Sequence, residues 1–87
     1  MTDPADLVYT PSRAEREHMV AVAAYYLAER RGFGPGREQE DWQCAERQID
    51  RMLAMMAQRG IDRRQFERAG MRNALHLWAG EETAEIV

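Results

Sequence analysis

The sequence predicts an all-α fold: an antiparallel helical hairpin with a third helix packed on it. Apolar residues recur three and four positions apart in three segments, which is the spacing of one helix face. Glycine and proline separate these segments at 32–36 and at Gly60, where they end helices. Capping-box patterns begin the first segment at Ser12 and the third at Asp62. We therefore expect a three-helix bundle, or a dimer in which apolar faces combine into a larger bundle.

The length and composition describe one small domain. The chain has 87 residues, of which 45% are hydrophobic and 31% charged, as is ordinary for a soluble globular protein. Its net charge of −3 argues against a general binder of nucleic acid or membranes, which needs a strong positive excess. The N-terminus has no apolar leader, and no run approaches the ~18 apolar residues of a membrane span. We expect a cytoplasmic protein.

The first helix is expected over residues 12–31, after an N-terminal tail. Pro4 and Pro11 forbid a continuous helix in residues 1–11, which we expect to be flexible. Whether the apolar residues 7–9 pack on the helices stays open. The helical domain as a whole is expected over residues 12–80.

Ser12 and Gly32 mark the two ends of this first helix. The Ser12 hydroxyl can accept the amide proton of Glu15, and the Glu15 carboxylate can reach back to the Ser12 amide. Gly32 is the expected left-handed terminator. The inward face of the helix comprises Met19, Val20, Ala23, Tyr26 and Leu27.

The segment from Gly32 to Gly36 is expected to be the turn of the hairpin. Its glycines supply backbone angles with positive φ, and Pro35 stiffens the crossing. The alternative is a phosphate-binding loop, but the segment lacks the GK[ST] ending, and the acidic residues that follow it would repel an anion. We interpret the segment as a connector between helices.

The second helix is expected over residues 38–59. Its first turn is acidic, which favours the positive end of the helix dipole, and Gly60 ends it. Its apolar residues form a single stripe: Trp42, Ala45, Ile49, Met52, Leu53 and Met56.

Three motifs follow one another along this hairpin. They are Ala24-Tyr25-Tyr26-Leu27-Ala28-Glu29, then Arg31-Gly32-Phe33-Gly34-Pro35-Gly36-Arg37, then Glu40-Asp41-Trp42-Gln43-Cys44-Ala45-Glu46-Arg47. Over residues 16–51 they resemble a bacterial family, domain-of-unknown-function family 2934. The resemblance implies the helical hairpin, and it implies no activity because the family has none assigned.

The start of the second helix is expected to close the hairpin. We expect Trp42 to be a buried anchor against Tyr26 or Arg30, and Ala45 to allow close approach of the two helices. Glu46 is expected to reach Arg30 or Arg31. The residues to which we assign a structural role are Ser12, Tyr26, Gly32, Pro35, Gly36, Trp42, Ala45 and Glu46.

The third helix is expected as one continuous element over residues 62–79. Asp62 and Gln65 form its capping box, and Gly80 is the expected terminator. Its apolar residues form two adjoining stripes, one at 66/70/74/77 and one at 71/75/78. One stripe can pack on the hairpin, and the other is spare. Residues 81–87 are expected to be an acidic tail.

The candidates for chemistry are few. Glu15 and His18 have the Glu-x-x-His spacing of di-iron bundles, but such a site needs two of these motifs and two further glutamates. His76 lies between Leu75 and Leu77, and we interpret it as a satisfied or partly exposed histidine and not as a ligand or a general base. Cys44 is the only cysteine, which excludes an intrachain disulfide and a thiolate zinc site. We expect no enzyme, no catalytic residue, no metal, no cofactor and no small-molecule substrate.

A protein-interaction module is therefore the leading functional hypothesis. It would self-associate or bind a larger bacterial protein through the third helix and the Met-rich edge of the second, because these elements carry more apolar residues than the bundle must bury. The alternative is a small nucleic-acid-associated regulator that uses the face of Arg64, Arg68 and Arg72. The candidate partner-binding residues are Met55, Arg64, Arg68, Met71, Arg72, Leu75 and Trp78.

Overall fold

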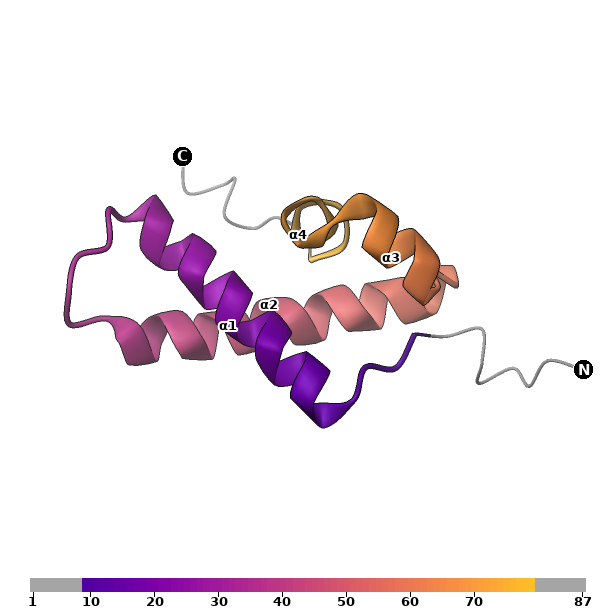
Figure 1. Cartoon of the computed structure of the whole chain (residues 1–87), viewed down its shortest axis with the longest axis horizontal. Coiled ribbons are helices and arrows are strands. Elements are labelled where there is room, and N and C mark those ends of the chain that lie inside the picture. The colour runs from indigo at the N-terminus through magenta and orange to yellow at the C-terminus, as the bar shows by residue number, and fades with distance from the viewer. Residues whose placement is uncertain (1–8, 80–87) are drawn as a thin grey trace, which may run out of the picture.

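The computed structural model describes residues 9–79 of the chain, and within them it contains four helices and no strand. The helices are α1 (Arg13–Arg30), α2 (Glu38–Arg59), α3 (Arg63–Ala69) and α4 (Met71–Trp78). In Figure 1, α1 crosses α2 obliquely, and α3 and α4 lie together beside the C-terminal half of α2. The prediction of an all-α fold is confirmed.

The ends of α1 form as their residues predict. The Glu15 amide donates to Ser12 Oγ at 3.1 Å, and the Ser12 amide donates to Glu15 Oε1 at 2.8 Å. At the other end Gly32 has φ +78, so it is the left-handed terminator. The amide of Phe33 then donates to the Ala28 carbonyl at 2.7 Å, which satisfies a carbonyl that the end of the helix leaves without a partner.

The connecting turn and α2 follow the same logic. Gly36 has φ +91, a left-handed conformation that a glycine adopts without strain. The helix α2 begins at Glu38 and ends at Arg59, where Gly60 has φ +68. The amide of Ile61 donates to the Met56 carbonyl at 2.9 Å and completes the end of this helix.

The prediction of one continuous third helix is wrong. The chain breaks at Gly70, which has φ +84 and ψ 157, and this conformation is essentially confined to glycine. The capping box of Asp62 and Gln65 is present and begins α3. Because the helix axis changes direction at Gly70, α4 packs on α2 and α1 in an orientation that a straight helix could not reach.

The core lies where α1, α2 and α4 meet. Four of its side chains, Val20, Ile49, Met52 and Met56, are almost completely buried. The C-terminal helices add Phe66, Ala74 and Trp78 to the same cluster. Burying these side chains is the main favourable contribution to folding, and each large one contributes about 1.5–3 kcal/mol.

The first described residues belong to the packed structure. The Tyr9 ring lies 5.4 Å from the Phe66 ring, centroid to centroid, and burial raises the pKa of its hydroxyl. The sequence left open whether Tyr9 packs on the helices, and the structure places it against the core cluster. Residues 1–8, and the predicted terminator and acidic tail within 80–87, lie outside the described part of the chain.

Candidate functional site

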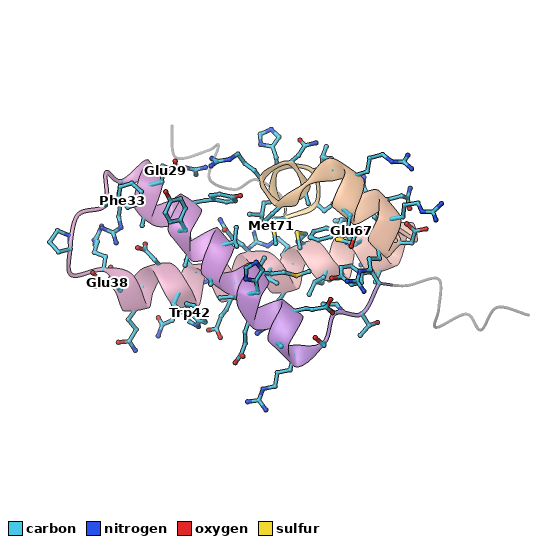
Figure 2. The ribbon with its side chains drawn as sticks, in the orientation of Figure 1. Glu29, Phe33, Glu38, Trp42, Glu67 and Met71 are labelled. Atoms are coloured by element: carbon cyan, nitrogen blue, oxygen red, sulfur yellow. The ribbon has the colours of Figure 1, made fainter. Side chains whose placement is uncertain are left out.

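Three large aromatic side chains are partly exposed at the end of the molecule where α1 and α2 are joined. The exposed fractions are 55% for Tyr25, 55% for Phe33 and 39% for Trp42. All three line one groove of about 340 Å³, which we call the aromatic groove. Figure 2 shows Phe33 in the connecting turn, and Trp42 in α2 beyond Glu38.

Small residues of α1 form the remaining wall of the aromatic groove. Ala21, Ala24 and Ala28 line it, together with Tyr25 from the same helix. Residues three and four positions apart share one side of a helix, so these four side chains form a continuous strip. The alanine side chains are short, which leaves room between the aromatic rings.

An ion pair between Arg31 and Asp41 also lines the aromatic groove. The Arg31 Nε atom lies 3.1 Å from Asp41 Oδ2, Nη2 contacts the same carboxylate, and Nη1 donates to the Gly34 carbonyl. Only 21% of the Arg31 side chain and 13% of the Asp41 side chain are exposed. Hydrogen bonds from Arg31 hold the pKa of the Asp41 carboxyl below its usual value.

Two further carboxylates lie beside Trp42. Glu38 lines the aromatic groove, and Glu46 stands one turn beyond Trp42 on the same helix. Within residues 9–79 neither carboxylate forms an ion pair with an arginine. Since Arg31 and Asp41 neutralise each other, the charge that remains in the groove is the negative charge of Glu38.

Phe33 is held in an unfavourable backbone conformation. Its φ is +60, and it is the single non-glycine residue with positive φ in the described chain. A left-handed conformation costs a non-glycine residue about 1–2 kcal/mol. Its ring lies 5.4 Å from the Tyr25 ring, yet more than half of the side chain faces water. The chain thus presents a large apolar side chain at a position that glycine would occupy more easily.

The apolar residues that we predicted to bind a partner are buried in the core or half-buried against it. Trp78 is 8% exposed, so its assignment to an external surface is wrong. Met55, Met71 and Leu75 are half-buried and pack against the core cluster. The break at Gly70 explains the difference, because it turns the stripe with Trp78 inward. Of the predicted residues, Met71 lines a second groove, of about 450 Å³, with Tyr9, Met19, Val22 and Phe66.

The arginine face also differs from the prediction. Arg72 Nη2 lies 3.1 Å from Glu29 Oε1, and its guanidinium lies 4.0 Å from the centre of the Tyr26 ring. Arg64 and Arg68 are exposed. One of the three arginines is therefore engaged within the chain, and the face offers less positive charge than the sequence indicated.

The predicted structural residues divide into two groups. Ser12, Gly32 and Gly36 stand as expected, and Ala45 is fully buried. The prediction that Trp42 is a buried anchor is wrong, because 39% of it is exposed and it lies in the groove with Tyr25.

The ion pairs of the helix pair also differ from those predicted. Arg31 pairs with Asp41, where we had expected Glu46 to reach Arg30 or Arg31. Asp50 pairs with Arg16 of α1 at 2.9 Å. Pro35 lies exposed in the turn, and Tyr26 is half-buried beneath Arg72.

Two features of the sequence pointed to the aromatic groove. Tyr25 lies off the inward stripe of its helix, and Phe33 lies in the turn.

The groups considered for metal or acid–base chemistry lie apart from one another. No set of three His, Cys, Asp or Glu residues in the described chain lies close enough to hold a metal ion. His18 and His76 are exposed, and Cys44 is half-buried in α2. Among residues 9–79, the helices are too short or too polar to cross a membrane.

The fold and the site thus define a small helical protein with an exposed aromatic groove. Residues 15–51 match the model of a family described as "Protein of unknown function (DUF2934)", which confirms the resemblance that the three motifs indicated. The matched segment is part of the chain, and it contains the three rings of the aromatic groove. No curated protein and no solved structure matches the sequence.

Proposed function

We propose that the chain is a small non-enzymatic protein-interaction module, and that the aromatic groove is its binding surface. The observation that supports this proposal is the exposure of Tyr25, Phe33 and Trp42 around one recess. Apolar surface left in water forgoes about 25 cal/mol per Å² that burial would supply. Tyrosine and tryptophan are also the residues that most often dominate binding energy at protein interfaces.

Phe33 gives independent support to this surface. The chain accepts a left-handed backbone there although 55% of Phe33 stays exposed. Strain that brings no gain in folding is found preferentially at functional positions. A ring that is held in water at such a cost is therefore better explained by a partner than by stability.

The proposal places the binding surface on α1, α2 and their connecting turn, and no longer on the third helix and the methionine edge. It takes α1 and α2 as an antiparallel hairpin, with α3 and α4 in the place of the third helix of a bundle. Met55 and Leu75 are half-buried, and Trp78 is buried, so they offer a partner less apolar surface than the aromatic groove does.

A nucleic-acid-associated regulator has less support. Such a protein needs several unpaired cations on one face. Arg72 pairs with Glu29, and Arg63 pairs with Glu15 and Glu67, all at 3.0 or 3.1 Å. A mobility shift with duplex DNA or RNA at low salt, lost in a variant with Arg64→Ala and Arg68→Ala, would restore this alternative.

Site-specific photo-crosslinking in the protein's own cells tests the proposal. A benzophenone side chain is introduced in place of Phe33, and in a control chain in place of Leu77, which is 52% exposed on α4. We expect discrete adducts from position 33 that are absent from position 77 and disappear when Trp42→Ser is added. No adduct from position 33, or the same adducts from both positions, would contradict the proposal.

A further inference from the structure

We infer that the aromatic groove binds an arginine or lysine side chain from a positively charged segment of a partner protein. The inference rests on the proposed function, and it adds the chemical class of the side chain that is bound. Three features support it: the ring faces, the remaining carboxylates and the size of the recess.

The rings supply the first feature. An aromatic face attracts a cation that lies within about 6 Å of the ring centre. The chain already uses this interaction twice within itself, since Arg72 lies 4.0 Å from the Tyr26 ring centre and Arg63 lies 5.7 Å from that of Tyr9. The three rings of the aromatic groove have no such cation among the described residues.

The carboxylates supply the second feature. Glu38, Trp42 and Glu46 are spaced four residues apart, so Trp42 has an acidic side chain one turn before it and one turn after it. Figure 2 shows Glu38 at the turn end of α2, near Phe33 and Trp42. Among the described residues Arg31 forms no ion pair with either glutamate, because its guanidinium contacts Asp41 and the Gly34 carbonyl, and it acts on Glu38 only through its charge. An incoming cation would therefore meet negative charge beside the rings.

The recess has the size for one side chain. Its volume of about 340 Å³ is at the small end of the range for ligand sites. The alanine strip of α1 can contact the aliphatic stem of an arginine or lysine, whose charged tip then lies among the rings and Glu38.

The same charges argue against other occupants. A phosphate of a nucleic acid or lipid would be repelled by Glu38 and Glu46. A second copy of the chain, related by a two-fold axis, would bring its own Glu38 and Glu46 into the same interface as those of the first, because both subunits use the same patch. A cationic partner is the occupant that complements this surface.

Titration with three short matched peptides, followed by the indole N–H signals in ¹H–¹⁵N NMR spectra, tests the inference. The probe is an acetylated and amidated alanine–glycine peptide with one central arginine, and the other two carry citrulline or norleucine instead. Citrulline keeps the shape of arginine without its charge, and norleucine offers an apolar stem alone. Trp42 reports the groove, and the buried Trp78 is an internal control.

We expect the arginine peptide to shift the Trp42 signal and the citrulline peptide to bind about tenfold more weakly. Phe33→Gly and Glu38→Gln should each weaken the binding, added salt should weaken it further, and Leu77→Ala should leave it unchanged. Equal or tighter binding of the citrulline or norleucine peptide would overturn the cationic assignment but not the proposed function, which the crosslinks from position 33 test separately.

Two other results would also overturn the inference. One is the absence of any Trp42 shift with the arginine peptide. The other is a doubled mass in light scattering that Phe33→Gly abolishes, because a second copy would then cover the groove. If position 33 also gives no crosslink, the proposed function fails as well.

Discussion

The Nε atom of Arg31 lies 3.1 Å from Oδ2 of Asp41, and this contact joins the end of α1 to the first turn of α2. The same guanidinium donates to the Gly34 carbonyl in the turn. One side chain thus holds both helix ends and the segment between them. Arg31 and Asp41 also line the aromatic groove.

Asp41→Asn should lower the thermal midpoint of unfolding. The substitution removes the charge that pairs with Arg31 in a place where both side chains are mostly covered. Glu40→Gln is the matched control, because Glu40 pairs with Arg37 and both side chains are more than 60% exposed. Thermal melts followed by circular dichroism compare the two. Equal midpoints for the two variants would show that the Arg31–Asp41 pair stabilises the fold no more than the exposed Arg37–Glu40 pair does.

The difference between the native chain and Asp41→Asn should shrink in acid. Hydrogen bonds from Arg31 hold the pKa of Asp41 below its ordinary value of 3.8. A lowered carboxyl pKa stabilises the fold above the unfolded-state value, and this stabilisation is lost as pH falls through the folded-state value. Urea titrations between about pH 7 and pH 3 measure this difference. A difference that does not change with pH would contradict the assignment.

The two tryptophans should differ in their contribution to stability. Trp78→Ala should cost about 3–5 kcal/mol, since the ring is buried beside Ala74 in the core. Trp42→Ala should cost only about 1–2 kcal/mol, because part of its ring already faces water. Urea denaturation of both variants measures the free energies of unfolding. A larger loss for Trp42→Ala would mean that Trp42 is the anchor that its sequence position suggested.

Local sequence signals predicted the helices well because each acts within a few residues. The Ser12 box and Gly32 set the ends of α1, and α2 runs between the predicted residues 38–59. The prediction that Trp42 is buried was wrong because the exposure of this residue depends on the angle at which α1 and α2 cross. Figure 1 shows α1 and α2 crossing obliquely and separating toward the turn, so the first turn of α2 is left partly uncovered. Periodicity along one helix contains no information about that angle.

The break at Gly70 was missed for a related reason. A glycine inside a helical pattern costs only about 1 kcal/mol relative to alanine, so the pattern alone allows the helix to continue. Packing favours the break at Gly70 over a continuous helix, because the break brings Ala74 and Trp78 onto the core. Because of the same break, Trp78 lies in the interior and not on the binding surface that we predicted.

Gly70→Ala should therefore destabilise the chain by about 1–3 kcal/mol. An added methyl group would meet no atom within 4 Å, so the cost comes from the backbone, which has φ +84. Ala69→Gly is a useful control, since its backbone is already helical and its substitution should cost about 1 kcal/mol or less. If Gly70→Ala raises stability instead, the chain prefers the continuous helix that the sequence pattern indicated.

The free energy of unfolding of Phe33→Gly tests the central claim most directly, namely that the exposed ring serves a partner and not the fold. Relief of the left-handed backbone should gain about 1–2 kcal/mol, while the lost contact with Tyr25 and the added freedom of glycine together cost about as much. We therefore expect urea denaturation to give a value within about 1 kcal/mol of the native chain. A loss of about 3 kcal/mol or more, the cost of removing a buried aromatic ring, would show that Phe33 holds the fold together and would contradict the claim.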